Sequence, residues 1–218
     1  MEHEFWIERW ELGETGFHQN EINPYLINHW KKLNPPQGSK VFVPLCGKSQ
    51  DMIWLNKQGH SILGVELSRI AVESFFSEFV QSPRILRGEA FDQYETDGVN
   101  IWCGDFFNLE KFELEGVNLV YDRASLIALP PEMRGNYVRH LASILSPETQ
   151  ILLVTMDYPQ HEMSGPPFAV STAEVEELYG NYADIRLLSE HDVLPQNPRF
   201  QRRGLSRMSE NIFQVTLR

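Results

Sequence analysis

Hydrophobic and polar positions along this chain form blocks that predict strands and helices in turn. Short apolar runs rich in β-branched and aromatic residues predict strands, whereas apolar residues three or four positions apart predict helices. The core elements expected in chain order are a strand 41–43, a helix 48–58, a strand 61–66, a helix 69–80, strands 99–103 and 117–121, a helix 132–145 and a strand 150–156, with a short irregular region before residue 99. Such alternation is typical of an α/β fold with a mostly parallel sheet and helices on both faces.

Both ends of the chain depart from this alternation. Two stretches with helical spacing, residues 5–12 and 22–33, precede the first strand. After the last core strand come a helix near 172–180 and two strand-like runs, 183–192 and 210–217. We expect these runs to follow one another without a helix, so they predict an antiparallel hairpin at the edge of the sheet.

The chain shows no internal repeat, low-complexity tract or linker, so we expect a single domain over residues 1–218. Within it, residues 1–35 are expected to form an N-terminal helical lid segment. Gly13 and Gly16 provide a plausible hinge for that segment. We find neither sustained heptads nor an obvious sticky edge, and we therefore expect a monomer.

The charge of the chain indicates which kind of substrate it binds, and its cysteines bear on whether it holds a metal. A formal net charge of −11 and a pI near 5.1 disfavour a nucleic-acid substrate, because the chain repels phosphate backbones. We therefore expect a small-molecule substrate.

The two cysteines, Cys46 and Cys103, lie in or beside predicted strands, and no Cys/His grouping has zinc spacing. Both are expected to be reduced core residues, with no metal site.

The N-terminal stretch is acidic and amphipathic, unlike a secretory signal peptide. No window approaches the roughly 18 apolar residues that a membrane-spanning helix requires. We therefore expect a cytoplasmic protein with no membrane association.

The most informative pattern lies between the first two strands. Pro44 ends the first strand, Gly47 permits a tight turn before the helix, and Glu66 ends the second strand about 20 residues later. An acid at that place accepts hydrogen bonds from ribose hydroxyls. Because the turn lacks the other glycines of G-x-G-x-x-G, the pattern favours a cofactor with a ribose and no pyrophosphate, such as S-adenosylmethionine. Some other α/β domain with a glycine turn is the alternative.

Polar residues also follow the later strands. In doubly wound sheets a ligand lies beyond the carboxyl ends of the strands, where this chain has Glu66, Asp105, Asp122 and Arg123. Purely structural roles are the alternatives: Asp105 as a turn cap, Asp122 and Arg123 as partners of each other, and Glu66 as a helix cap.

Five segments together carry a family resemblance. They are PLCGKSQDMIWL (44–55), GHSILGVELS (59–68), CGDFF (103–107), YDRASLIALP (121–130) and GPPF (165–168). Over nearly the whole chain, the sequence resembles the thiopurine S-methyltransferase family, including its bacterial members. The resemblance implies a Rossmann-like class I S-adenosylmethionine-dependent methyltransferase fold with a seven-stranded sheet, and methylation of a sulfur atom. Bacterial relatives are linked to selenium and tellurium compounds, so the acceptor is expected to be a small thiol or chalcogen compound.

The resemblance also assigns roles to single residues. The residues that it implies for cofactor binding are Trp10, Leu45, Glu66, Asp105, Phe106 and Arg123. Phe17 and Arg199 match its acceptor-binding positions, and Arg123 with Arg199 match its catalytic arginines. Arg199 is the best match within the loop 198–205, which contains several arginines.

Methyl transfer from a sulfonium is an in-line displacement in which charge disperses, so alignment of the reactants is the expected main contribution of the protein. Nearby arginines favour the anionic form of an acidic thiol or selenol. Two other functions stay open from the residues themselves: a non-catalytic nucleoside or small-anion binding protein, and a dinucleotide oxidoreductase, which the missing glycines disfavour.

Overall fold

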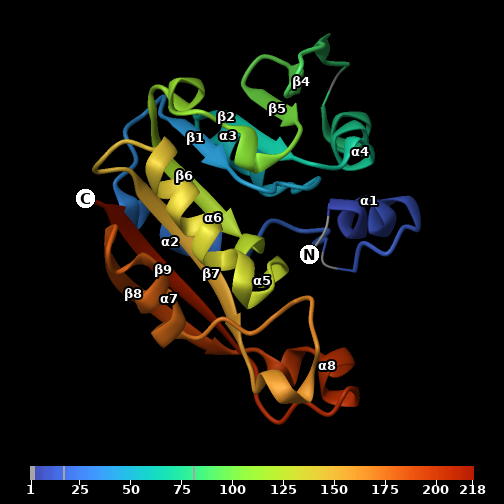
Figure 1. The fold of residues 1–218 in the computed structure, drawn as a ribbon, viewed down its shortest axis with the longest axis vertical. Coiled ribbons are helices and arrows are strands. Elements are labelled where there is room, and N and C mark those ends of the chain that lie inside the picture. Colours follow the sequence, from blue (N-terminus) through green and yellow to red (C-terminus); the bar gives the residue numbers. More distant parts are fainter. Residues whose placement is uncertain (1–2, 17, 81) are drawn as a thin grey trace. The chain divides into compact units, whose positions relative to one another are not determined.

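A computed structural model describes residues 3–16, 18–80 and 82–218 of the chain. The chain groups into two compact units, Met1–Tyr121 and Asp122–Arg218, which are described in turn (Figure 1). The single methyltransferase domain expected from the sequence stays a prediction.

The first unit contains most of the parallel sheet. Its elements are α1 (His3–Glu11), α2 (Pro24–His29), the 3-10 helix η1 (Trp30–Leu33), β1 (Lys40–Val43), α3 (Asp51–Lys57), β2 (Ser61–Glu66), α4 (Arg69–Phe79), β3 (Arg84–Leu86), β4 (Asp92–Glu95), β5 (Val99–Cys103), the 3-10 helices η2 (Phe106–Asn108) and η3 (Lys111–Leu114), and β6 (Val117–Arg123). The strand order is β3-β4-β5-β2-β1-β6. The pairs β5–β2, β2–β1 and β1–β6 are parallel, whereas β3–β4 and β4–β5 are antiparallel.

The central strands form where the sequence is continuously apolar. Phe42 in β1 pairs with Leu63 in β2, and Gly64 in β2 pairs with Ile101 in β5. Phe42, Leu63 and Ile101 are all buried. Parallel strands covered on both faces need this composition, and this explains why the predicted strand 61–66 has the observed bounds.

The irregular region expected between α4 and residue 99 was a wrong prediction, because it contains the antiparallel strands β3 and β4. All three residues of β3, including Ile85 and Leu86, are exposed. A strand without a buried face shows no period-2 alternation, so the pattern gave no signal. The described residues form nine strands where seven were expected.

The second unit is antiparallel. Its further elements are α5 (Ser125–Ala128), α6 (Pro131–Ile144), β7 (Gln150–Asp157), the 3-10 helix η4 (Gln160–Glu162), α7 (Thr172–Tyr179), β8 (Ala183–Asp192), the 3-10 helix η5 (Leu194–Gln196), α8 (Pro198–Arg202) and β9 (Ser209–Leu217). β9 pairs with both β7 and β8. The predicted antiparallel β8–β9 pair is therefore confirmed, but η5 and α8 interrupt the connection that was expected to contain no helix. Figure 1 shows α8 at the end of this pair opposite to the C-terminus.

The helices before β1 are tied to the first unit by polar contacts. Both oxygens of Asp51 accept a hydrogen bond, from the Asn23 N–H at 2.8 Å and from the Tyr121 hydroxyl at 2.9 Å. Trp30 Nε1 donates to His60 Nε2 at 3.1 Å, and both side chains are buried. Residues 23–33 thus belong to the core of this unit, which leaves α1 as the part of the N-terminal segment for which a lid role is proposed below.

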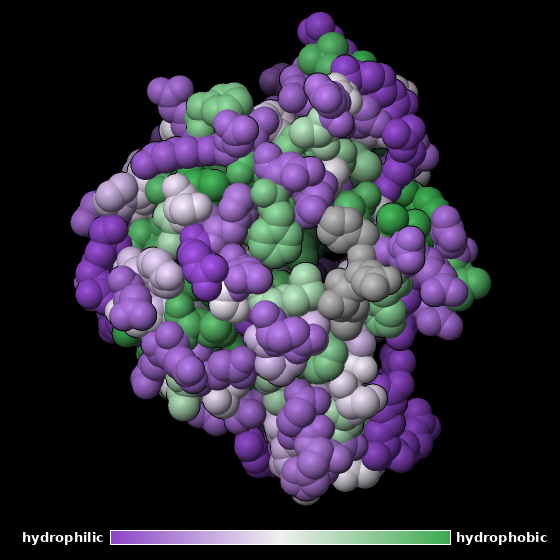
Figure 2. Space-filling view, viewed as in Figure 1, coloured by the Kyte–Doolittle hydropathy of each residue, from purple (hydrophilic) through white to green (hydrophobic). Residues whose placement is uncertain are grey.

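The surface agrees with the composition. Figure 2 shows hydrophilic residues over much of the viewed face, with apolar residues between them. Among the described residues, no helix has the length and apolar content needed to cross a membrane.

The Trp30–His60 contact generates a prediction about pH. The ring of His60 is buried and accepts a hydrogen bond, so it must be neutral, and burial lowers its pKa below 6.5. The unfolded chain then binds a proton that the folded chain does not, and stability contributed above pH 6.5 is lost as the pH falls below it. Between pH 7.5 and 5.5, urea unfolding should show a loss of up to about 1.4 kcal/mol from this group.

His60→Gln is the matched variant, because its amide oxygen still accepts from an indole N–H but does not titrate in this range. The pH dependence of its unfolding free energy should be shallower by the same amount. Identical slopes for the two proteins would exclude His60 as the source.

Candidate cofactor and acceptor site

The turn after β1 has an unusual backbone. Leu45 and Gly47 both have positive φ, 45° and 53° respectively. The left-handed region costs a residue with a Cβ roughly 1–2 kcal/mol, so the fold must hold Leu45 there. One hydrogen bond that restrains the turn is donated by the Cys46 N–H to the Val65 carbonyl of β2 at 2.9 Å. The turn is thereby fixed against the end of the next strand.

Glu66 supplies the main restraint on this turn. One carboxylate oxygen, Oε2, accepts from the Gly47 N–H at 2.8 Å, and the other, Oε1, accepts from the Ser68 N–H at 2.7 Å. The residue is only 7% exposed. A carboxylate has about four acceptor sites, so acceptor capacity remains for the hydroxyl groups of a ligand.

Two opposing effects act on the pKa of Glu66. Burial raises it, and hydrogen bonds from the backbone N–H groups of Ser68, Gly47 and Leu67 oppose that rise. The helix-cap alternative for Glu66 is not what the structure shows. Ser68 itself is the N-cap of α4, since its hydroxyl accepts from the Ala71 N–H at 3.4 Å. Glu66 instead fixes the position of this capping residue.

The loop after β5 joins the same edge. The Gly104 N–H donates to the Glu66 carbonyl at 2.9 Å. Asp105 caps the following turn, with its Oδ1 accepting from the Phe107 N–H at 2.9 Å. The ring of Phe106 is buried and stacks on Phe42 at 6.4 Å between centroids. Phe106 therefore contributes its ring to the core, while Asp105 lies at the strand end.

Trp10 of α1 reaches this turn. A Cβ placed on Gly47 would lie 3.4 Å from Cζ2 of the Trp10 ring, so the indole packs directly on the glycine. Trp10 is 7% exposed. The first unit thus brings together Trp10, Leu45 and Glu66 around one backbone turn.

Both cysteines near Glu66 are free thiols. Burial and the charge of Glu66 raise the pKa of Cys46 well above its usual range, and raise the pKa of Cys103 to about 11. Since the thiolate is the reactive form, neither residue is a nucleophile at neutral pH. Cys46 is a buried core residue as expected, whereas Cys103 is only partly buried.

The second unit begins with the pair predicted at the end of the fourth core strand. Asp122 and Arg123 are the last two residues of β6, which is two residues longer than predicted. Asp122 is fully buried, and its Oδ2 accepts from the Tyr137 hydroxyl at 2.7 Å. The alternative in which Asp122 pairs only with Arg123 is therefore wrong.

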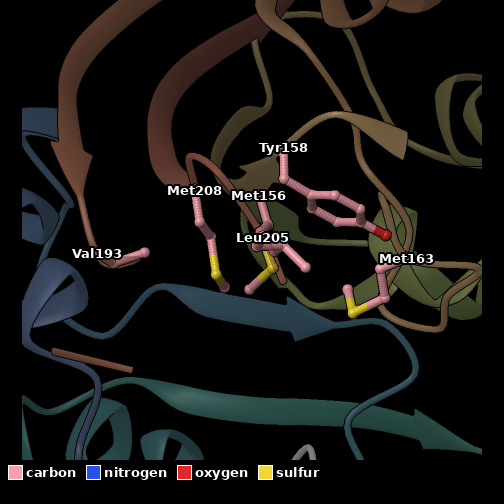
Figure 3. Packing of buried hydrophobic residues seen from close by; sticks show 6 residues of the cluster. All are labelled: Met156, Tyr158, Met163, Val193, Leu205 and Met208. Atoms are coloured by element: carbon pink, nitrogen blue, oxygen red, sulfur yellow. The ribbon is translucent and has the colours of Figure 1, made fainter. Parts of the chain in front are cut away.

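Arg199 lies on α8, within the connection between β8 and β9. A methionine-rich cluster fixes this connection: Met156, Tyr158, Met163, Val193, Leu205 and Met208 pack together (Figure 3). Phe200, the neighbour of Arg199, packs against the cluster. The loop after β7 and the loop that carries Arg199 therefore share one apolar core.

Polar contacts distinguish the arginines of this loop. Arg203 donates to the sulfur of Met163 at 3.6 Å, and Arg207 pairs with Asp157 at 2.9 Å. Among the residues that the structure describes, neither Arg199 nor Arg202 forms a salt bridge. Phe17, the other predicted acceptor contact, lies outside the described residues.

Two supporting residues, Ser68 and Tyr137, were not predicted from the sequence. Ser68 stands directly before a predicted helix, and a serine at this place is a usual N-cap signal. Tyr137 gave no signal, because a tyrosine on the apolar face of an amphipathic helix is ordinary core composition. Only the structure places its hydroxyl on Asp122.

Known proteins are similar to this chain over its whole length. A sequence model of the family described as Thiopurine S-methyltransferase (TPMT) matches residues 1–218. A protein of Nitrosospira multiformis named Thiopurine S-methyltransferase is 61% identical over 218 residues, covering 100% of this chain and 99% of its own. A namesake from Marinobacter nauticus is 48% identical and covers 98% of each chain.

Solved structures share the fold at low identity. A SAM-dependent methyltransferase from Anabaena variabilis has a TM-score of 0.68 and 11% identity, covering 99% of this chain and 95% of that one. The Burkholderia thailandensis 1,6-didemethyltoxoflavin-N1-methyltransferase, solved with S-adenosylhomocysteine, has a TM-score of 0.64 and 13% identity, covering 98% and 87% respectively. The predicted class I methyltransferase fold is confirmed.

The contacts of Glu66 generate a prediction about stability. In Glu66→Gln one carboxylate oxygen becomes an NH₂ group, which faces the N–H of Gly47 or of Ser68. The variant should lose about 1–3 kcal/mol of unfolding free energy, because a buried donor is left without an acceptor. Urea unfolding measures this loss. Glu113→Gln is the control, since Glu113 accepts from the Glu110 N–H at 2.7 Å in a hydrogen bond that is exposed to solvent; equal losses in both variants would contradict the role of Glu66.

Proposed function

Because this chain belongs to the thiopurine S-methyltransferase family, we propose that it transfers a methyl group from S-adenosyl-L-methionine to the sulfur of small aromatic or heterocyclic thiols such as thiopurines. The observation that carries this proposal is the buried Glu66 carboxylate, which fixes the Gly47 turn and retains acceptor capacity. A ribose diol supplies the two donors that such a carboxylate can accept. The single-glycine turn fits a cofactor without a pyrophosphate.

Other residues of the first unit are proposed to complete the cofactor site. Trp10 would contact the cofactor from α1, and Leu45 from the turn after β1. Asp105 and Phe106 would contribute the loop after β5. The packing of Trp10 on Gly47 supports a role for α1 as a lid segment, since its indole already lies on the turn that the cofactor would occupy.

When bound, S-adenosyl-L-methionine supplies an electrophilic methyl group on a sulfonium. Arg123 and Arg199 are proposed to hold the acceptor, with Arg123 also contributing to cofactor binding. A guanidinium stabilises the anionic form of an acidic thiol and orients it through its planar fork. Because an acceptor bound as an anion has no proton to lose, these residues work by orientation, and no general base is required for it.

The methionine-rich cluster supports the role of Arg199. It fixes the loop that carries this residue, and the partners of Arg203 and Arg207 give those two arginines structural tasks. We further propose that selenium and tellurium compounds are acceptors, that the protein works in the cytoplasm, and that it is a monomer.

Labelled methyl transfer tests this function. The wild-type chain, with S-adenosyl-L-methionine and a panel of thiols and selenols, should methylate thiopurines, and calorimetry should show binding of S-adenosylhomocysteine but not of NADH. Glu66→Gln, measured where it is folded, should bind S-adenosylhomocysteine at least about tenfold more weakly, because charge-assisted hydrogen bonds contribute about 1.5–3 kcal/mol. Cofactor binding without transfer to any acceptor would favour a non-catalytic nucleoside-binding protein instead.

Arg123→Lys separates orientation from charge. Lysine keeps the charge but loses the fork, so kcat/KM for an acidic thiol should fall by about tenfold or more, roughly 1.4 kcal/mol. The loss should be smaller for thiols that stay neutral at the assay pH, since they offer no anion to hold. Arg139→Lys is the control, because Arg139 is an exposed arginine of α6 whose hydrogen bond goes to Asn136. An equal loss for neutral and ionised thiols would refute the anion-orienting role.

A further inference from the structure

The direction in which Arg123 leaves its strand depends on a single residue. β6 ends at Arg123 and α5 begins at Ser125, so only Ala124 separates the strand from the helix. Ala124 has a φ of 74° and a ψ of 0°, in the left-handed region. A residue with a Cβ is held there only when its surroundings determine its conformation. The contacts that restrain this turn therefore also determine where the guanidinium of Arg123 is presented.

Those contacts converge on the carboxylate of Asp122. Burial is the main cause that raises the pKa of Asp122 to about 6, and hydrogen bonds from the Tyr137 hydroxyl and from the hydroxyl and backbone N–H of Ser125 limit the rise. Asp122 is joined to Arg123 by a peptide bond on one side of the turn. Through its hydrogen bonds with Ser125, the Asp122 side chain also interacts with the other side of the turn. Arg123 and Ala124 thus lie between two residues, Asp122 and Ser125, that interact with each other across the turn.

Tyr137 fixes that carboxylate to the helix behind it. Its hydroxyl donates to Oδ2 at 2.7 Å, and both residues are fully buried. Oδ1 of Asp122 has no hydrogen-bond partner among the described residues. Loss of the tyrosine hydroxyl leaves Ser125 as the remaining donor, so the rotation of the carboxylate about its χ angles is less restricted.

We propose that Asp122, held by Tyr137 of α6, is a positioning residue that fixes the strand-to-helix turn presenting Arg123, and so sets the affinity for an anionic acceptor. This inference rests on the proposed role of Arg123. Asp122 acts through its neighbour: it is buried, touches no reacting atom in this scheme, and exchanges no proton during transfer. The ligand whose affinity Asp122 influences is the anionic form of a small acidic thiol or selenol.

Tyr179 provides a matched control. It is a fully buried tyrosine whose charge state is influenced by Asp122, yet its hydroxyl has no hydrogen-bond partner among the described residues. Tyr179→Phe and Tyr137→Phe therefore remove the same atom from the same surroundings of the same carboxylate. Only Tyr137→Phe removes a hydrogen bond to it.

A double-mutant cycle on the full chain tests the inference. In the wild-type background, Tyr137→Phe should lower kcat/KM for an ionised thiopurine by about fivefold, mainly through KM, because a hydrogen bond to a charged group is lost. In an Arg123→Ala background the same change should alter kcat/KM by less than twofold, since the residue through which it acts is gone. Tyr179→Phe should stay within twofold in both backgrounds. An equal loss from Tyr137→Phe in the two backgrounds would overturn the inference and leave a purely structural role.

A second readout does not depend on turnover. In ¹⁵N NMR spectra the Nε–Hε signal of Arg123, assigned by its absence in Arg123→Ala, should shift or broaden in Tyr137→Phe and stay in place in Tyr179→Phe. An unchanged signal in both variants would overturn the inference even if the enzyme is active. A wild-type chain that binds cofactor but methylates no thiol would instead refute the proposed function, whatever the NMR result.

Discussion

The hydrogen bonds accepted by Glu66 are the constraint on which the rest of the first unit's strand edge depends. Parallel strands end at one edge of a sheet, but the loops that follow them have no reason to stay together. The Glu66 side chain joins the turn after β1 to the start of α4, and its carbonyl joins the loop after β5. Three loops that are distant in sequence are thereby held by one residue. Removing the charge of the side chain would weaken its two contacts, with Gly47 and Ser68, and would leave the carbonyl contact with Gly104 in place.

The second unit uses a carboxylate in a comparable way. Asp122 is buried at the end of β6 as Glu66 is buried at the end of β2, and a left-handed residue lies in the turn near each of them, Ala124 and Gly47 respectively. A buried carboxylate is costly unless hydrogen-bonded, so each position is stable only with its donors in place. The donors differ in kind: backbone N–H groups of a turn serve Glu66, whereas a helix tyrosine and a serine serve Asp122. Rigid turns at strand ends suit a reaction that depends on alignment.

The sequence predicted those parts of the fold whose physics is local. The strands 61–66 and 99–103 have the predicted bounds, because β-branched and aromatic residues there meet turns or polar breaks, and the strand 183–192 also has the predicted bounds. The β3–β4 hairpin escaped prediction because β3 buries nothing, and α8 escaped because five residues are too short to show a helical period. Glu66 and its spacing from Gly47 were visible as a pattern.

The partners of these acids were not predictable in the same way. Whether Asp122 binds Arg123 or Tyr137 depends on how α6 packs against β6, and the spacing of residues in the sequence does not predict this packing. Tertiary contacts between elements 15 residues or more apart decide it. The arginines between residues 198 and 207 show the same limit, since Arg203 contacts Met163 of the loop after β7 and Arg207 pairs with Asp157 at the end of β7.

A protein that brings a methyl donor to sulfur must also protect its own sulfur atoms. Cys46 and Cys103 lie beside the carboxylate proposed to bind the cofactor, and both are thiols with raised pKa values. The negative charge of Glu66 contributes to this rise in each case, because a thiolate next to a carboxylate is doubly penalised by burial and repulsion. The reactive form of each cysteine is therefore disfavoured where the methyl donor is expected, whereas Arg123 and Arg199 are proposed to favour the anion of the acceptor. Glu66 thus has two effects. It fixes the turn at which the cofactor is proposed to bind, and it favours the protonated form of the neighbouring thiols, which is methylated slowly.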